Sequence, residues 1–270
     1  MRTLAEPTSR KSCAESRGSP RASNSRYASQ MPEKLDLIRE RKLDELVPGK
    51  KKGDRLEASG VALIDDTTAA VIFDNLNVVA RIDLSLEPKD TNRLHPAPSL
   101  ADGFEDIAID HEGRRVFCLI ESMEVTDGKY RGLLSEYDSE FRLQRCARLS
   151  MTFDTPNKGF EGLTFQRHGD DQYIYAMCEG NLCTAATSGG GRIQVFKRTP
   201  EGNWQHDHVI EIPLTAEFED YAGISYRDGW LGVVSQASAR VWIAEVDPHA
   251  KLIVDGSQAV YAFPKASYGN

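Results

Sequence analysis

Short apolar segments alternate with polar turns along most of the chain. From Leu56 onward, the apolar runs are separated by turn sequences such as "IDD", "DHEG", "RHGDD" and "TPEGN". Short apolar runs bounded by Gly, Asp and Asn are typical of β-strands, and helical periodicity is almost absent. The pattern therefore predicts an all-β protein. The segment "LDLIRERKLDEL", residues 35–46, fits either a charged helix or an edge strand, and we favour the strand.

Four segments of the chain share one internal order. Each has an entry strand, an Asp/Gly turn, a second apolar strand that ends in a polar residue, a third strand and a looser fourth one. The segments begin with "EASGVALIDDTTAAVIF", "GFEDIAIDHEGRRVFCLIES", "GFEGLTFQRHGDDQYIYAMCEGN" and "DYAGISYRDGWLGVVSQ". Four antiparallel strands in a repeat of roughly 45 to 60 residues are typical of a β-propeller blade.

The two ends of the chain bear on the number of blades. The fourth repeat is followed by "AVYAFP", which fits an outer strand, and then by "KASYGN", which parallels "TPNKGF" before the third repeat. We therefore predict a β-propeller of about five blades in residues 31–270, truncated at the C-terminus so that the last blade is incomplete. Residues 35–46 would be the outer strand of that last blade. A closed four-bladed propeller is the alternative.

Residues 1–30 differ from the rest of the chain. They are rich in Ser and Arg and poor in large apolar residues, so they cannot offset the entropy of ordering, and we predict that they are disordered. No apolar core of a secretory signal follows the basic residues. No apolar run approaches the roughly 20 residues that cross a bilayer. We expect a soluble, cytoplasmic protein without a membrane partner.

Charge and cysteine content narrow the function classes. The chain has 41 acidic and 33 basic residues, a net charge of −8, which argues against a nucleic-acid partner because phosphates favour a basic face. A protein that handles a cation or a small molecule fits better. Five cysteines without paired C-x-x-C elements indicate free thiols in a reduced compartment. The alternative is a loop disulfide between Cys178 and Cys183 in an oxidising one.

One glutamate enters the first strand of two repeats. Glu105 and Glu161 occupy the same place, where the first repeat has Ser59 and the fourth has Ala222. The first strand of a propeller blade lines the central channel, so these carboxylates are expected to face it. Converging carboxylates repel one another unless a cation lies among them. A set of hard oxygen ligands suits Ca²⁺, which takes about six to eight oxygens in flexible geometry.

A second set of polar residues ends the second strand of each repeat. Its members are Asn75, Glu121, Glu179 and Gln236. The two sets can face each other across one hairpin, so Glu121 and Glu179 join Glu105 and Glu161 as predicted metal ligands. For any single member of the second set, a solvated turn residue is the alternative.

Arginine begins the third strand of three repeats. These residues are Arg131, Arg192 and Arg240. Arginines that recur beside carboxylates can neutralise them structurally, which we favour, or can form a site for an anionic ligand. In the second case Asn75 and Gln236 would be further ligand contacts.

The segments "GFEDIAI…FCLIES" and "GFEGLTF…YAMCEGN" resemble the esterase-like-activity-of-phytase β-propeller family and the related SdiA-regulated propellers. The resemblance covers approximately residues 55–265. It implies an acidic site at the channel mouth that holds Ca²⁺ and, for some members, hydrolysis of phosphoesters or esters. Glu105 and Glu161 match the entry glutamate of the family, and Glu121 and Glu179 match the strand-end acid. The first and fourth repeats depart from it at Ser59, Asn75, Ala222 and Gln236.

These observations predict a propeller with a Ca²⁺ site at the channel mouth that binds a small-molecule, anionic or protein ligand. A calcium-dependent phosphoester or carboxylester hydrolase is the alternative. The chain has no G-x-S-x-G element for a nucleophilic serine and no distinctive general base. The oligomeric state is not indicated.

Overall fold

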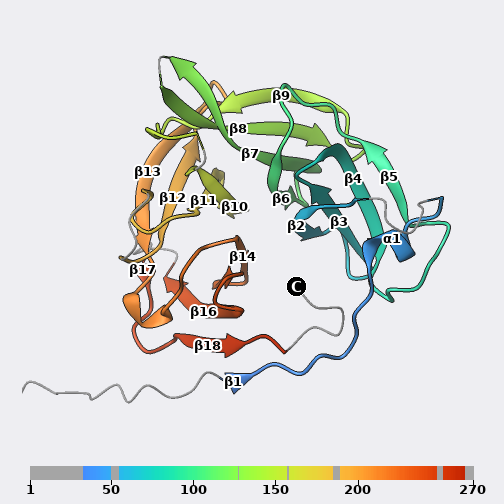
Figure 1. Ribbon diagram of the computed structural model, residues 1–270. Coiled ribbons are helices and arrows are strands. Elements are labelled where there is room, and N and C mark those ends of the chain that lie inside the picture. Colours follow the sequence, from blue (N-terminus) through green and yellow to red (C-terminus); the bar gives the residue numbers. More distant parts are fainter. Residues whose placement is uncertain are drawn as a thin grey trace, which may run out of the picture. The chain divides into compact units, whose positions relative to one another are not determined.

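The chain folds into four β-sheets that succeed one another along the sequence (Figure 1). The computed structural model describes residues 33–49, 55–126, 128–156, 158–184, 189–247 and 252–264. In the first three sheets, successive strands pair antiparallel, as in the blades of a β-propeller, and the fourth sheet is antiparallel apart from one short parallel pair. The β-propeller prediction is confirmed. The described residues form four blades, which is the alternative that the sequence left open, rather than five.

Three blades are simple four-stranded meanders, and the fourth is more elaborate. Blade 1 comprises β2 (Ala58–Leu63), β3 (Thr68–Phe73), β4 (Leu76–Asp83) and β5 (Arg93–Pro96). Blade 2 comprises β6 (Phe104–Asp110), β7 (Arg115–Thr126), β8 (Lys129–Asp138) and β9 (Leu143–Arg148). Blade 3 comprises β10 (Phe160–His168), β11 (Asp171–Cys178), β12 (Arg192–Arg198) and β13 (Trp204–Glu211). After a 3₁₀ turn, η1 (Leu214–Ala216), blade 4 comprises β14 (Gly223–Arg227), β15 (Trp230–Ser235), β16 (Arg240–Asp247), β17 (Leu252–Ile253) and β18 (Ala259–Ala262).

The first strands of successive blades pack side by side: β2 against β6, β6 against β10, and β10 against β14. An apolar cluster fills each seam between neighbouring blades. Phe117, Phe160 and Phe196, for example, pack together between blades 2 and 3. The sheets of blades 2 and 3 are covered on both faces by these clusters. Their strands are therefore apolar on both faces, which explains the short continuous apolar runs in the sequence.

The N-terminal part of the described chain joins the last blade to the first. β1 (Glu33–Lys34) pairs parallel with β18, so it belongs to blade 4. Further along, α1 (Leu43–Leu46) lies beside blade 1 (Figure 1). Leu46 and the following Val47 pack against the apolar face of that blade. The predicted edge strand over 35–46 is wrong. Leu43, Leu46 and Val47 have helical spacing, and the face of blade 1 gives that apolar stripe a surface to cover.

Cys178 and Cys183 form a disulfide, with Cα atoms 5.1 Å apart, so the expectation of free thiols is wrong for this pair. Cys118 and Cys146 are free. Disulfides persist mainly in oxidising compartments, and the cytoplasmic location stays a prediction. Among the described residues, no helix is long and apolar enough to span a membrane. The disorder predicted for residues 1–30 and the motif predicted in "SYGN" lie outside the described residues.

Candidate functional site

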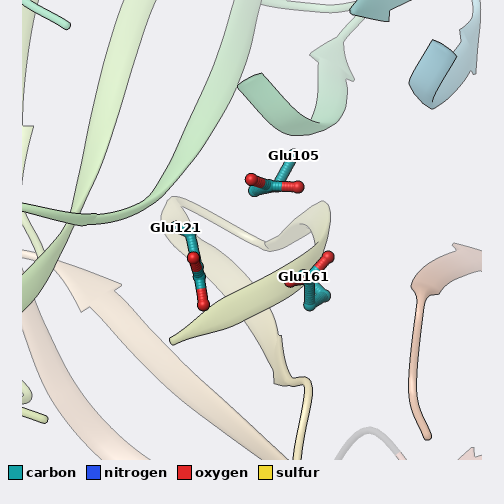
Figure 2. Close-up of side chains that lie close together, drawn as sticks. All are labelled: Glu105, Glu121 and Glu161. Carbon is teal, nitrogen blue, oxygen red and sulfur yellow. The ribbon is translucent and has the colours of Figure 1, made fainter. Parts of the chain in front are cut away.

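Three glutamates gather where the first strands of blades 2 and 3 begin. Carboxylate oxygens of Glu105, Glu121 and Glu161 all lie within 4.8 Å of one another (Figure 2). All three side chains are partly buried. They come from β6, β7 and β10, so residues 56 positions apart in sequence share one site. We call this group the glutamate cluster.

Each member of the glutamate cluster lies at a β-bulge. The register of β6 on β7 shifts between Phe104 and Asp106, which leaves Glu105 outside the ladder. β10 has the same shift around Glu161. On β7, Glu121 and Ser122 together lie opposite the single residue Gly132 of β8. A bulge redirects the side chain of its extra residue, so these three irregularities allow the carboxylates to converge.

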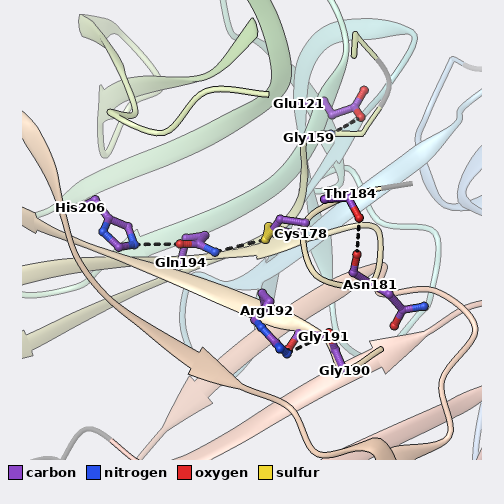
Figure 3. Close-up of a disulfide and its surroundings, with 11 residues drawn as sticks. Glu121, Gly159, Cys178, Asn181, Thr184, Gly190, Gly191, Arg192, Gln194 and His206 are labelled. Atoms are coloured by element: carbon purple, nitrogen blue, oxygen red, sulfur yellow. Dashed lines mark hydrogen bonds between the residues drawn. A yellow bond between two sulfur atoms is a disulfide. The ribbon is translucent and has the colours of Figure 1, made fainter. Parts of the chain in front are cut away.

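Gly159 brings blade 3 up against Glu121. Its N–H donates to Glu121 Oε1 at 2.9 Å (Figure 3). A Cβ atom at this position would lie 2.5 Å from the carbonyl oxygen of Glu121, which real Cβ atoms do not tolerate. Only glycine therefore permits this approach, and it accounts for the glycine that precedes Phe160 and Glu161 in the sequence.

Burial and mutual repulsion make the cluster hold protons at neutral pH. Burial, followed by the charges of Glu105, Glu121 and Glu179, raises the pKa of Glu161 to about 9. Burial and the charge of Asp74 raise the pKa of Glu105 to about 7. A hydrogen bond between the two carboxyls lowers the pKa of Glu105 and raises that of Glu161, so Glu161 is the protonated donor. Burial also raises the pKa of Glu121.

The fourth predicted ligand, Glu179, lies near the cluster but is neutralised. Lys158 Nζ donates to both carboxylate oxygens of Glu179, each at 2.7 Å. The backbone of Glu179 is fixed as well: its N–H donates to the carbonyl of Gly159, and its carbonyl accepts from Tyr221 N–H. The adjacent disulfide closes the loop that carries it (Figure 3). The structure thus brings three of the four predicted ligands together and gives the fourth its own cation.

Two of the three predicted arginines are held by carbonyl or carboxylate groups near them. Arg192 Nη1 donates to the carbonyls of Gly190 and Gly191 at 3.0 Å each, and its Nη2 lies 3.3 Å from Glu211. Arg240 lies 3.5 Å from Glu217. Arg131 lies opposite Met123 in the β7–β8 ladder, and its buried Nε has no hydrogen-bond partner.

The remaining predicted residues lie at turns. Asn75 closes the turn before β2, since its Oδ1 accepts from Glu57 N–H and its Nδ2 donates to the carbonyl of Arg55. Gln236 is exposed in the turn after β15. Ser59, the equivalent of Glu105 in blade 1, donates its hydroxyl to the carbonyl of Phe104. An anion site built from these arginines, Asn75 and Gln236 stays a prediction.

Asp106 is a functional candidate that the sequence reasoning did not find. It is buried directly beneath the cluster and accepts hydrogen bonds from the N–H groups of Leu163 at 2.6 Å and Ile107 at 2.8 Å, and from that of Ile224. One carboxyl therefore joins the first strands of blades 2, 3 and 4. Burial raises its pKa well above the ordinary value. The available signal was its register, because the other three repeats have glycine there: Gly60, Gly162 and Gly223.

Asp106 lies along the first strands between the glutamate cluster at one end and a cavity at the other. A Cβ atom at Gly60 would lie 2.7 Å from Asp106 Cα, so β2 and β6 approach closely at this level. The glutamate cluster lies toward the strand starts. Toward the strand ends, residues of β2, β6, β10 and β14 line a cavity of about 730 Å³. None of the three glutamates lines that cavity.

No protein-family model matches the sequence, and no curated protein matches it either. Among solved structures, glutaminyl cyclase of Myxococcus xanthus is similar at 15% identity over 77% of this chain and 71% of that one, with a TM-score of 0.47. Hydrazine synthase of Kuenenia stuttgartiensis is similar at 13% identity over 70% and 52%, with a TM-score of 0.41. An auxiliary nutrient binding protein of Bacteroides thetaiotaomicron is similar at 11% identity over 76% and 41%, with a TM-score of 0.43. At these identities and TM-scores the comparisons assign no function to the chain.

Proposed function

We propose that the glutamate cluster binds a divalent cation, Ca²⁺, at the mouth of the propeller. The observation that carries this proposal is the convergence of three partly buried carboxylates, whose burial and mutual repulsion raise the pKa values of Glu105 and Glu161. A cation in their midst would replace the protons that these groups hold. Lys158 Nζ pairs with Glu179 instead.

The loose grouping of the oxygens suits calcium better than magnesium. The carboxylate oxygens lie within 4.8 Å of one another, and Ca²⁺ takes about six to eight oxygens in flexible geometry. Mg²⁺ requires a stricter octahedron at about 2.1 Å. Three carboxylates offer at most six oxygens, so Glu105, Glu121 and Glu161 would share the cation with solvent or a ligand. The bulges can accommodate this because their residues are not tied into the ladder.

The bound ligand is expected to be a small anion, such as a phosphoester or a carboxylate. A cation in the cluster would leave coordination positions that anionic oxygens of the ligand can fill. A cationic ligand has no oxygen charge to offer there. We therefore infer a binding function in which the cation recognises the anionic part of the ligand.

Calorimetric titration of Ca²⁺ into protein stripped with chelator tests this proposal. Wild-type protein should bind one ion, and Glu161→Gln should weaken binding by about tenfold or more, because it removes a ligand oxygen's charge. Glu112→Gln is the matched control, since Glu112 is exposed and lies at the opposite end of the first strands. Unchanged affinity in Glu161→Gln, or equal losses in both variants, would overturn the assignment.

A calcium-dependent ester or phosphoester hydrolase is the second candidate function. The observation in its favour is the pKa of Glu105, which burial and Asp74 raise to about 7, a value suited to a general base at neutral pH. When bound, the cation would polarise the phosphoryl or carbonyl oxygen of the substrate. In that role Glu105 would stay outside the coordination of the cation, accept the proton of the attacking water and pass it to the leaving group, while Glu121 and Glu161 would hold the cation. The resemblance to the esterase-like-activity-of-phytase family supports this candidate.

Hydrolysis is tested by the release of p-nitrophenol from its phosphate and acetate esters, with Ca²⁺ and with chelator. Activity that requires Ca²⁺ and disappears in Glu105→Gln would support a hydrolase. Glu105→Gln keeps the size of the side chain and its capacity to accept from Glu161. Turnover that persists in chelator or in this variant would exclude the cluster as its source, while leaving the cation-binding proposal to calorimetry.

A further inference from the structure

A second candidate site is the cavity at the strand ends of the four inner strands. Its volume is about 730 Å³, within the range of roughly 300–1,000 Å³ that is typical of small-molecule sites. Its walls carry aliphatic and aromatic side chains, among them Val61, Leu63, Ile109 and Phe165. It lies on the other side of the Asp106 level from the glutamate cluster. A ligand here would be distinct from one at the glutamates.

Apolar side chains of β2 are exposed to solvent at the cavity wall. At the position of Val61, the other repeats bury their apolar side chains. Val61 and Leu63 are two positions apart on one strand, so they point to the same side. Val61 is 64% exposed and Leu63 is 43% exposed, and both line the cavity. In the register of the repeats, the counterparts of Val61 are buried: Ile107, Ile224 and Leu163. Two large apolar groups that are open at the wall of a cavity indicate a surface that a ligand covers.

The rim of the cavity carries an excess of negative charge. Four exposed carboxylates line it, from Asp65, Asp66, Glu112 and Asp228, together with the buried Asp110, against the two guanidiniums of Arg167 and Arg227 and the imidazole of His111. Both arginines are already engaged. Arg167 lies 2.7 Å from Asp110, and Arg227 lies 3.5 Å from Asp228. Within the part of the chain that the structure describes, no lysine or arginine pairs with Asp65 or Asp66.

We propose that this cavity binds an organic cation with an apolar body and an ammonium or guanidinium head. The apolar body covers Val61 and Leu63, whose burial supplies most of the affinity. The head lies toward Asp65 and Asp66, in the turn that directly follows the same strand. Like-charge repulsion by these acids rejects anions of the same shape. The cavity thus has the opposite ligand preference from the anionic ligand proposed for the glutamate mouth.

The test compares three probes with one body: 4-phenylbutylammonium, 4-phenylbutanol and 4-phenylbutanoate. Each is titrated calorimetrically into the full chain at pH 7, at low salt and with chelator, so that no divalent cation contributes. The ammonium should bind at least about tenfold more tightly than the carboxylate, with the alcohol between them. That order would support recognition of a cationic head.

Variants assign the site. Leu63→Ser should weaken the ammonium and the alcohol alike, by roughly tenfold, whereas the exposed Leu214→Ser, on η1, should change neither. The double change Asp65→Asn and Asp66→Asn should reduce the advantage of the ammonium and leave the alcohol unaffected. Glu161→Gln should leave all three probes unchanged.

Several outcomes would overturn the proposal. Equal affinity for the three probes would remove the charge preference, and no binding at millimolar concentration would remove the site. Wild-type affinity in Leu63→Ser, with circular dichroism confirming the fold, would show that the probe binds elsewhere. A loss in Glu161→Gln would place the probe at the glutamates instead.

Discussion

Buried carboxylates occur both in the seam between blades 2 and 3 and in the glutamate cluster, but their neighbours differ. In the seam, Asp110 is 2% exposed and lies 2.7 Å from guanidinium nitrogens of both Arg115 and Arg167. In the cluster, Glu105 and Glu161 face each other and Glu121. The seam therefore balances its buried charge with the protein's own cations, whereas the cluster does so with protons.

The seam continues outward as a connected polar network. Arg115 donates to Gln172 Oε1 at 2.7 Å, and Arg198 lies 3.3 Å from the same oxygen. Arg198 also donates to Glu136 at 3.0 Å, and the indole N–H of Trp204 donates to Glu136 at 3.0 Å. Every carboxylate oxygen in this chain of contacts has a donor. Such a network fixes one blade against the next and leaves little for an external ion to gain.

The pKa of Asp110 follows the same division, whereas burial raises the pKa of Glu136 in spite of its donors. Burial raises the pKa of Asp110, but hydrogen bonds from Arg167, Gly113 and Arg115 outweigh it, so the pKa is lowered overall. In the glutamate cluster, burial and like charges act in the same direction and raise the pKa values of Glu105 and Glu161. The comparison indicates that the carboxylate of Asp110 stabilises the fold, whereas the carboxylates of the cluster lack cationic partners of this kind, which is the basis of the cation site proposed above.

The largest effect is expected in the seam. Asp110→Ala would leave two partly buried guanidiniums without their shared carboxylate and should lower the free energy of unfolding by about 4 kcal/mol. Urea unfolding measures the loss. Asp154→Ala is the control, because its pair with Lys129 is exposed and should be worth less than about 1 kcal/mol. Similar losses in both variants would mean that the seam is no better than a surface ion pair.

Asp106 differs from both Asp110 and the glutamate cluster, because backbone N–H groups donate to its buried carboxyl. Asp106→Ala would orphan the N–H groups of Leu163 and Ile224 and should cost about 3 kcal/mol in urea unfolding. Asp106→Asn should cost only about 1 kcal/mol, since an amide oxygen can still accept from them and burial already favours a neutral side chain. In contrast, Asp110→Asn should cost nearly as much as Asp110→Ala. Equal effects of asparagine at the two positions would contradict the distinction.

The repeats in the sequence predicted more of the fold than of the site. The fourfold order of strands and turns predicted the blades, and the shared entry position of Glu105 and Glu161 predicted that they lie at the same end of neighbouring strands. The repeats left the number of blades open between five and four. An N-terminal strand was expected to pair with the last blade, and β1 does pair with β18, but the contact of Leu46 and Val47 with blade 1 was not expected.

The details of the cluster depend on deviations from the period. A strict alternation of side chains would not aim Glu105, Glu121 and Glu161 at one point, and the bulges that do so have no composition signal of their own. The pairing of Glu179 with Lys158 likewise joins residues from two different segments. Asp106 occupies a position where the other three repeats have glycine, and this difference is visible in the sequence. Only the structure shows that the carboxyl is buried there, which makes it a functional candidate.

The disulfide offers a smaller test, on the cluster side of the comparison. Replacing Cys178 and Cys183 together by serine opens a short loop that carries Glu179, and it should lower the free energy of unfolding by about 2 kcal/mol. It should also weaken Ca²⁺ binding, because the pair of Glu179 with Lys158 loses its fixed backbone. Cys146→Ser, at a free thiol on β9, is the control and should change neither. Unchanged calcium affinity in the double variant would separate the loop from the site.

The smallest and most diagnostic effect concerns Glu105 in protein without calcium. Its folded pKa, about 7, lies above the unfolded value near 4.3, so its contribution to stability is fully present below that unfolded value. The contribution is lost as the pH rises through 7, when the carboxylate becomes charged among Glu121, Glu179 and Asp74. Wild-type protein in chelator should therefore lose stability between about pH 4 and pH 7.

Glu105→Gln removes that charge. It should therefore raise the free energy of unfolding, whereas the Asp110 substitutions in the seam lower it. At pH 8 the variant should be more stable than wild type in chelator by about 1 kcal/mol or more, and this advantage should disappear as the pH falls to about 4. Glu245→Gln, an exposed position on β16, is the control and should show no such dependence on pH. Saturating Ca²⁺ should cancel this advantage, because the charged Glu105 of wild type binds the ion and the neutral glutamine does not. A variant that is less stable than wild type at pH 8 in chelator would mean that the cluster, like Asp110, is already balanced by the protein itself.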